Sequence, residues 1–338
     1  MSQQKKNPPG VDPLDWSRIR MRSRSERRHK VAVSALGKAP PAGCPFGEWF
    51  ASLPDFLGAR ELRRAVSAVV AARRAGRGVV FAFGGHVIKT GCSRLVIDLI
   101  ERGIVTAVAS NGSGPIHDLE LAETGTTSEE VAETIRDGSF GMVHETCERL
   151  NEAARRGAQG MGLGRAVGEL LDAGDAPYKE LSIYAAAARV GIPATAHVAI
   201  GTDTVHMHPQ ADGAAIGAAT MADFRTICAV VAGLGALTPG EPGGVWLNVG
   251  SAVVLPEVFL KAVSVARNLG HNLDALHTAN FDMLHHYRPT QNVLVRPVAE
   301  GHGHAVFGQH EILLPLFRQA VVEALDRETW VETRERER

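Results

Sequence analysis

Histidines are the residues of this chain that most plainly could do chemistry, because there are fourteen and several lie close together. Two His-x-His pairs stand out, His206 with His208 and His302 with His304. Two imidazoles at a strand end can meet at one point and bind a divalent metal. Histidines serve equally well as general acids, substrate contacts or subunit contacts. No complete metal signature such as H-E-x-x-H accompanies the pairs, so both interpretations stay open.

The stretch from Val79 to Glu120 carries a second group of candidates. Val79–Phe83 is a short run of β-branched and aromatic residues, which predicts a strand buried on both faces. Apolar residues then recur at helical spacing from Thr90 to Gly103, and Ile104–Ala109 predicts the next strand. Parallel strands place the turns after their carboxyl ends at one edge of a sheet, where ligands bind.

Glycines and polar residues occupy these two turns. They are Gly84, Gly85, Lys89, Thr90 and Gly91 on the first, and Asn111, Gly112, His117 and Asp118 on the second. Glycine lets a backbone N–H approach a pyrophosphate closely. Lys89 suits a nucleophile by location, or a phosphate-pairing or surface residue. Asp118 suits a ligand contact or a carboxylate that stabilises a helix N-terminus.

Two later turns follow predicted strands in the same way. Asp203 follows Ile192–Ile200, and Gly250 and Ser251 follow Val245–Val249. A carboxylate at such a place can hold ribose hydroxyls. An Asx turn is the structural alternative for Asp203.

These motifs, read in order, resemble the nucleotide-binding core of the deoxyhypusine synthase family. The matching segments are GGHVIKTGC, VASNGSGPIHDLE, GTD at 201–203 and GVWLNVGSAVV at 244–254. The resemblance implies an NAD cofactor and a homotetramer with sites between subunits. The cofactor-binding residues it implies are Gly84, Gly85, Thr90, Gly91, Asn111, Gly112, Asp118, Asp203, Gly250 and Ser251.

The family's own reaction is not expected here. Its W-G-K motif is missing from the sequence, and its Lys-His-His is replaced by Leu255-Pro256-Glu257. Imine formation with an enzyme group requires a deprotonated amine, which the lysine of the W-G-K motif supplies in the family. We therefore expect an NAD-binding transferase or oxidoreductase that acts on a small polar amine or carboxylate.

The candidates for that chemistry lie near the beginning and near the end of the segment that resembles the family. Lys89, His117, Asp282 and His285 are the catalytic candidates, and Glu257, Asn280 and Arg288 are the substrate-binding candidates. Arginine beside histidine favours a carboxylate or phosphate group. The alternatives are a metal-dependent hydrolase or lyase that uses the histidines, and a non-catalytic ligand-binding relative.

Alternating predicted strands and helices indicate an α/β fold with a doubly wound, mostly parallel, Rossmann-like sheet. Asn292–Val295 is predicted as a further strand, and Pro315–Leu325 as a helix with proline in its first turn. The glycine-rich segment Gly157–Gly168 has no strand before it. It therefore predicts a mobile loop rather than a dinucleotide fingerprint.

Composition limits the function classes. The 338 residues are 45% hydrophobic and 22% charged, which is ordinary for a soluble globular protein. The polar N-terminus, the four scattered cysteines and the lack of an 18-residue apolar run predict a cytoplasmic protein with no membrane segment. A net charge of −1 gives no general attraction to nucleic acid.

Charge is nevertheless uneven along the chain. Ten Lys/Arg residues and three acids lie between Lys5 and Lys38. This pattern predicts a basic extension over residues 1–45, a single domain over 46–330 and a charged tail over 331–338. The extension suits a solvated or subunit-docking segment, or an arm that binds RNA or another anion.

Overall fold

The computed structural model describes residues 11–12 and 14–336, with side chains described up to residue 326. Its centre is one sheet of six strands in the order β3-β2-β1-β4-β5-β6. The strands are β1 (Val79–Phe83), β2 (Ala107–Asn111), β3 (Ala194–His197), β4 (Val245–Val249), β5 (His277–Asp282) and β6 (Gly303–Phe307). All neighbouring pairs are parallel. The predicted doubly wound α/β fold is therefore confirmed.

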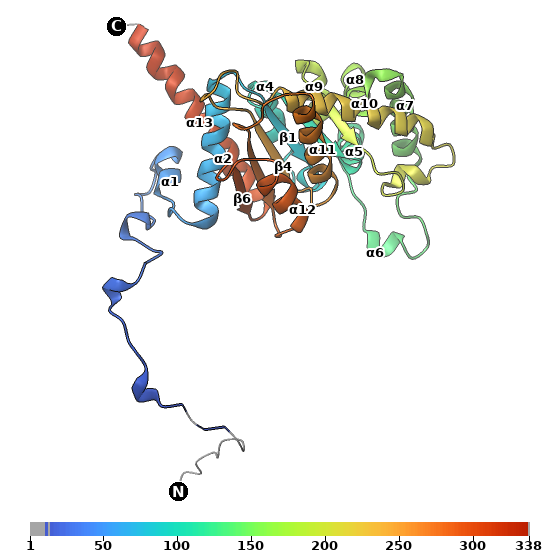
Figure 1. The fold of residues 1–338 in the computed structure, drawn as a ribbon. Helices are drawn as coiled ribbons and strands as arrows, with labels where there is room; N and C mark the ends of the chain where they lie inside the picture. Colours follow the sequence, from blue (N-terminus) through green and yellow to red (C-terminus); the bar gives the residue numbers. More distant parts are fainter. Residues whose placement is uncertain (1–10, 13, 337–338) are drawn as a thin grey trace.

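Helices cover both faces of this sheet (Figure 1). Strand β1 shows why, because successive side chains of a strand point to opposite faces. Val79, Phe81 and Phe83 belong to one apolar cluster, and Val80 and Ala82 belong to another. The first cluster is completed by α2 (Leu57–Arg74), α4 (Ser93–Glu101), α5 (Ser113–Thr124), α7 (His144–Arg156), α8 (Leu163–Ala173), α9 (Ile183–Val190) and α13 (His310–Arg336). The second is completed mainly by α10 (Gly213–Ala232) and α11 (Val254–Asn268).

Shorter elements connect these layers. They are α1 (Phe46–Ser52), α3 (His86–Lys89), α6 (Val131–Thr134), α12 (Tyr287–Pro289), the 3-10 turns η1 (Trp16–Arg18), η2 (Arg24–Glu26), η3 (Val33–Ala35), η5 (Lys179–Leu181) and η6 (Thr204–Met207), and the π-helical turns η4 (Gly157–Met161) and η7 (Thr290–Val295). Helix α6 lies on a long loop that hangs away from the body (Figure 1).

The strand predicted at Asn292–Val295 is wrong. These residues form η7, part of the crossover that two neighbouring parallel strands, β5 and β6, require. Val293 is fully buried in the second apolar cluster, and its carbonyl accepts a hydrogen bond from Thr278 Oγ1 at 2.8 Å. The predicted C-terminal helix begins earlier than expected, so Pro315 lies inside α13 and not in its first turn.

The mobile loop predicted at Gly157–Gly168 is also wrong. This segment forms η4 and the first half of α8. Asp223, a buried residue of α10, accepts hydrogen bonds from Gly164 N and Ala196 N, both at 2.9 Å. The carboxylate thus satisfies backbone donors at the start of α8 and ties that helix to β3.

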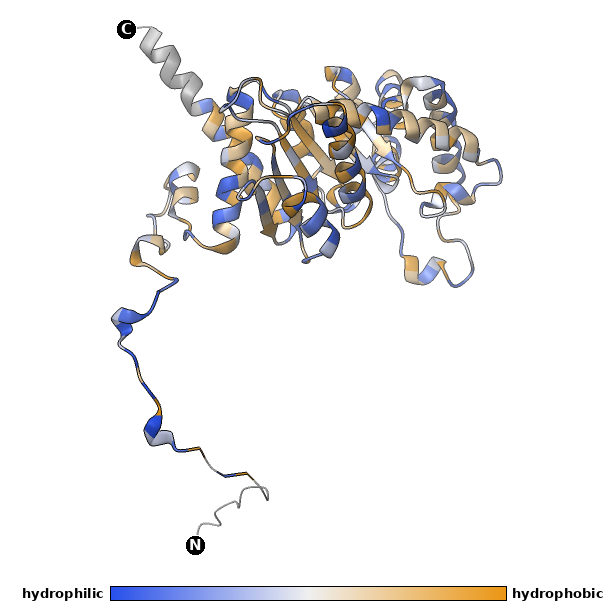
Figure 2. Ribbon diagram, viewed as in Figure 1, coloured by the Kyte–Doolittle hydropathy of each residue, from blue (hydrophilic) through white to orange (hydrophobic). Residues whose placement is uncertain are grey.

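The N-terminal arm, described for residues 11–12 and 14–45, extends away from the body as a chain with three short turns (Figure 1). Apolar residues are spaced along a largely hydrophilic ribbon (Figure 2). Leu14, Trp16, Met21 and Val33 are 78–90% exposed.

Among the described helices, α10 is the one long and apolar enough to cross a membrane by composition alone. It packs against α7, α8, α11 and β3. A core helix of a soluble protein passes the same test, so this finding is weak evidence for a membrane span.

Candidate functional site

The strand order places a topological switch point between β1 and β4. From β1 the chain continues to β2 on one side, and from β4 it continues to β5 on the other. In open α/β sheets the crevice at the carboxyl ends of two such strands is where ligands bind. The two turns here touch, because Gly84 N donates to Val249 O at 3.0 Å. A Cβ at Gly84 would overlap Gly250 O, so this position requires glycine.

The backbone N–H groups of the first turn are already engaged by protein atoms. Gly84 N is bonded to Val249 O, and Gly85 N donates to Ser113 Oγ at 3.3 Å. Gly91 N and the Thr90 hydroxyl bond to carbonyls of α3. We expected these glycines to face a pyrophosphate. Their hydrogen bonds and contacts instead join the turns after β1, β2 and β4.

The turn after β2 offers a freer anion site. Helix α5 begins at Ser113, and no side-chain cap is recorded for it in the described chain. The first N–H groups of a helix have no partner within it and attract phosphate groups. Ser113 Oγ donates to Asn111 Oδ1 at 2.8 Å, which fixes the polar groups beside this helix end.

Asp203 lies directly against this turn. A Cβ at Gly112 would overlap the Asp203 carboxylate, so glycine is what lets the carboxylate approach. Burial raises the pKa of Asp203 above its ordinary value, with His206 acting in the opposite direction. Thr202 Oγ1 lies 3.4 Å from the carboxylate but gives its one proton to Ala199 O at 2.7 Å. The carboxylate caps the first turn of η6 in a capping box with His206, and its remaining lone pairs can accept from ligand hydroxyls.

A cavity of about 400 Å³ opens beside Asp203. It lies between Lys89 at the end of α3, His117 and Glu120 on α5, and the first turn of α7, and the loop around α6 forms its outer wall. This volume is in the range of small-molecule sites. The structure thus brings three predicted residues, Lys89, His117 and Asp203, to one cavity.

His117 is the best-oriented titratable group of this cavity. Its Nδ1 lies 2.8 Å from Thr127 Oγ1, and Thr127 Oγ1 lies 2.5 Å from Glu120 Oε2. A hydroxyl has one proton, and the carboxylate can only accept, so Thr127 donates to Glu120 and accepts from His117. His117 therefore carries its proton on Nδ1, which leaves Nε2 free to accept one.

Glu120 is the ionised end of this hydrogen-bonded chain from His117 through Thr127 to Glu120, which we call the His117 relay. Desolvation alone would raise its pKa, but hydrogen bonds with His117, Thr127 and Thr146 outweigh that effect and lower it. Thr146 Oγ1 approaches Glu120 Oε1 at 3.2 Å. A fixed anion of this kind stabilises an imidazolium that forms at His117.

Asp118 does not face this cavity. It is fully buried, and its carboxylate accepts hydrogen bonds from the Ser182 hydroxyl, from Ile183 N at 2.8 Å and from Tyr184 N at 3.2 Å. Burial raises its pKa to about 6, against these hydrogen bonds. Asp118 therefore joins α5 to the start of α9. The predicted cofactor contact is not what this geometry offers.

A buried polar pair lies under the crevice on the β4 side. Asn248 Nδ2 donates to Ser251 O at 2.9 Å and to Asn280 Oδ1 at 2.7 Å. Asn248 Oδ1 is buried without a hydrogen-bond partner among the described residues. Asn248 is fully buried and does not line the cavities described here, so this pair joins β4 to β5 beneath the turns.

The other predicted residues lie outside the cavity. Glu257 is paired with Arg288 Nε at 3.3 Å and with Lys261, on the surface of α11 and α12. Asp282, at the end of β5, is 5% exposed and accepts from Leu284 N at 3.3 Å. His285 packs against Phe307. The charges of Glu257 and Arg288 thus satisfy each other and do not line a pocket.

The predicted metal residues do not form a metal centre. No group of three or more His, Cys, Asp or Glu side chains in the described chain could hold a metal ion. His206 Nδ1 accepts from Gly201 N and Asp203 N, and His208 Nδ1 accepts from Gln210 N. Both imidazoles therefore serve local turns.

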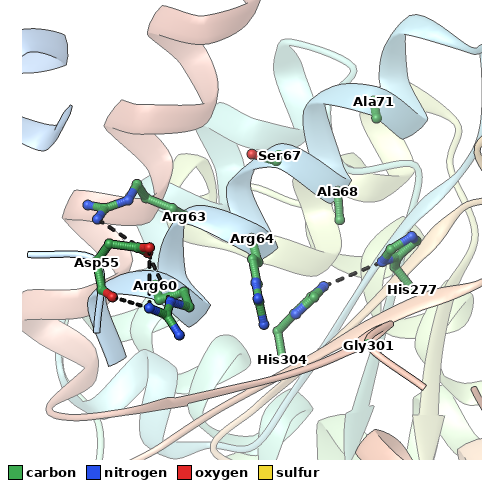
Figure 3. Close-up of a pocket in the computed structure, with 10 residues that line it drawn as sticks. All are labelled: Asp55, Arg60, Arg63, Arg64, Ser67, Ala68, Ala71, His277, Gly301 and His304. Carbon is green, nitrogen blue, oxygen red and sulfur yellow. Dashed lines mark hydrogen bonds and ion pairs between the residues drawn. The ribbon is translucent and has the colours of Figure 1, made fainter. Parts of the chain in front are cut away.

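His304 and His277 line a second, larger cavity of about 680 Å³ between α2 and β6 (Figure 3). His302 is not among the lining residues, and its ring stacks on His277 with the ring centroids 4.0 Å apart. Glu61 Oε2 lies 3.3 Å from His304 Nδ1. His277 and His304 lie at the amino ends of β5 and β6, which is the edge opposite the switch point. We therefore place the functional site at the smaller cavity.

Several solved structures share this fold, although no family model and no curated protein matches the chain. Unliganded AgrE matches with 16% identity and a TM-score of 0.51 over 78% of this chain and 33% of AgrE. A proposed LOR/SDH protein from Methanococcus maripaludis S2 matches with 14% identity and a TM-score of 0.49 over 85% and 74% of the two chains. A proposed deoxyhypusine synthase from Entamoeba histolytica matches with 12% identity and a TM-score of 0.45 over 85% and 96%.

These matches concern the fold. The chain spans about a third of the length of AgrE, which has also been solved in a ternary complex with ornithine and NAD+.

Sequence reasoning missed the partners that orient the histidines. Thr127 and Glu120 lie ten and three residues after His117, and a Glu three residues along a helix was a usable signal. His86 and His310 are 224 residues apart, and their 2.9 Å contact has no local signature.

Proposed function

We propose that this chain is an NAD-binding enzyme that transfers a hydride to or from a small polar metabolite bearing an amine or a carboxylate. The observation that carries the proposal is the strand order 3-2-1-4-5-6, with the uncapped start of α5 and Asp203 together at its carboxyl edge. This is the arrangement by which α/β domains hold a dinucleotide.

The residues present fit the cofactor. The N–H groups at the start of α5 suit a phosphate, and the Asp203 carboxylate suits ribose hydroxyls. NAD+, when bound, supplies a hydride acceptor. His117 would take a substrate proton on Nε2, and the relay to Glu120 would hold the resulting imidazolium.

Charges in the cavity favour a small polar substrate. Lys89 presents an ammonium group, and Glu120, Glu129 and Asp203 present carboxylates. A substrate that carries both signs of charge would find partners on both sides. Lys89 would pair with the anionic end, and a nucleophilic role for it is the alternative.

Calorimetric titration with NAD+ tests the cofactor part of the proposal. We expect saturable binding to the wild-type protein and loss of binding in Asp203→Ala, because the ribose contact is removed. A carboxylate beside the ribose also repels a 2′-phosphate, so NADP+ should bind more weakly than NAD+. Glu257→Gln, on a distant surface ion pair, is the matched control. No binding of NAD+ by the folded wild type would refute the proposal.

A homo-oligomer is the second part of this proposal. The arm carries exposed apolar side chains, four of them 78–90% exposed, and residues 1–45 hold ten Lys/Arg against three acids. The rest of the chain holds 34 acids against 26 Lys/Arg. An apolar, basic arm therefore fits an acidic body of another copy.

A further inference from the structure

A second histidine relay lies on the other side of the Gly84-Gly85 turn. His86, the first residue of α3, places its Nδ1 2.9 Å from Nδ1 of His310, the first residue of α13. His310 Nε2 lies 3.2 Å from Phe281 O, at the carboxyl end of β5. A Cβ at Gly250 would come within 2.8 Å of the His310 ring, so this ring lies against the turn after β4.

Proton positions in this pair follow from the acceptor at its inner end. A carbonyl oxygen only accepts, so His310 Nε2 must carry a proton. His310 is 1% exposed. When its ring carries this one proton, Nδ1 is bare and accepts the proton of His86 Nδ1. His86 Nε2 is left as the free nitrogen, and no hydrogen-bond partner is recorded for it among the described residues.

His86 has a free ring nitrogen that can gain a proton, whereas both nitrogens of His310 are in hydrogen-bond contacts. His86 is half-buried, and the charged groups that act on it are Glu311, Lys89 and Asp282. Desolvation and then the His310 ring lower its pKa, so the free base predominates at neutral pH. A proton added at Nε2 leaves the bond from Nδ1–H to His310 intact. The pair can therefore change charge without rearranging.

We propose that His86 is a second proton-transfer residue of the switch-point crevice, with His310 as the positioning residue that fixes its tautomer. His86 Nε2 takes a proton from an O–H or N–H group of the bound ligand, and its imidazolium returns that proton to solvent. This inference rests on the proposed function, because it needs a ligand bound at the carboxyl edge of the sheet, beside the turns after β1 and β4.

His86 and His117 both lie beside the Gly84-Gly85 turn. The ring of His117 packs on Gly85, where a Cβ would come within 2.7 Å of its Cδ2. His86 follows Gly85 directly in the chain. A ligand bound at this turn would meet one histidine linked through Thr127 to a carboxylate and one linked through His310 to a carbonyl.

Long-range 1H–15N spectra of 15N-histidine-labelled protein test the relay without any turnover. We expect the Nε2–H tautomer for His310 and the Nδ1–H tautomer for His86, assigned with His310→Asn and His86→Asn. His86→Asn keeps a side-chain N–H near the position of Nδ1–H and should leave the His310 tautomer unchanged. His310→Leu should give a mixture of tautomers at His86, and His310→Asn, which retains an acceptor, should restore one. An Nδ1–H tautomer at His310 would overturn the assignment.

Adding NAD+ to the same samples tests the place of His86 in the crevice. We expect the His86 15Nε2 signal and its pKa to shift at NAD+ concentrations at which calorimetry shows that the wild-type protein is saturated. The imidazoles of the opposite edge, His277 and His302, should not shift. NAD+ binding without a change at His86 overturns this inference alone. No NAD+ binding in the calorimeter refutes the proposed function and removes this inference with it.

Discussion

At the scale of single residues, whether a histidine can transfer a proton here depends on the hydrogen-bond partner of its other ring nitrogen. His206 and His208 each accept a hydrogen bond at Nδ1 from a backbone N–H group of a turn. His117 uses Nδ1 in a hydrogen bond to Thr127, whose hydroxyl donates to the Glu120 carboxylate. Its Nε2 therefore remains free beside the cavity. Chemistry therefore follows the partner and not the spacing of histidines along the chain.

Thr127→Val should disconnect His117 from Glu120. The Nδ1–H of His117 and one oxygen of Glu120 lose their partner, so we expect a destabilisation of about 1 kcal/mol in urea unfolding. The tautomer preference of His117 should weaken in 15N spectra, and the pKa of Glu120 should rise. Thr127→Ser retains the hydroxyl and is the control. Equal behaviour of the Val and Ser variants would contradict the relay.

At the scale of elements, buried carboxylates hold helices to the sheet. Asp118 anchors the start of α9, and Asp223 joins the start of α8 to β3. Both bind backbone N–H groups, and no arginine or lysine partner is recorded for either among the described residues. Such anchors keep α5 and α8 in place, and α5 carries the site residues.

Asp223 gives a pH test of this arrangement. Burial raises its pKa from 3.8 to about 7, against hydrogen bonds from Ala196, Gly164 and Leu163. The folded state then binds more protons than the unfolded state between these values, so this group's contribution falls as pH rises from about 4 to 7. In urea unfolding, Asp223→Asn should be less stable than wild type at pH 5, with the gap narrowing by pH 8. A gap that widens with pH would show that Asp223 is ionised in the folded protein throughout.

At the scale of the whole molecule, the arm exposes apolar side chains that belong to neither apolar cluster of the described part of this chain. The described apolar side chains of the arm are largely exposed, and we propose that they form an interaction surface. The proposed functional site lies on the body at the carboxyl edge of the sheet. Assembly and ligand binding can thus be tested separately.

Replacing Leu14, Trp16 and Met21 together by Ser should reduce the molar mass measured by light scattering in solution. The apolar contact of the arm with another copy would be lost, while the body should keep its unfolding midpoint. Leu237→Ser and Leu269→Ser, which change side chains 71% exposed on the body, are the controls. An oligomer that survives the triple change, or a monomeric wild type, would contradict arm-mediated assembly.

The sequence by itself determined the elements whose signals are local. The apolar run 79–83 is β1 at the predicted bounds, and the glycine turns after β1, β2 and β4 lie at one edge. β5 was missed because its buried Thr278, Asn280 and Asp282 read as polar loop residues, whereas neighbouring strands and side-chain bonds satisfy them.

Only the tertiary structure decided which candidates meet. Glu257 and Arg288 pair with each other away from the cavity, and Asp118 binds backbone N–H groups at the start of α9. His86 lies beside His310, although the two are 224 residues apart in the sequence. Hydrogen bonds form between atoms about 3 Å apart, however distant they are in sequence. Residue types set what chemistry is available, and the packing of the sheet and helices sets which groups can share a proton.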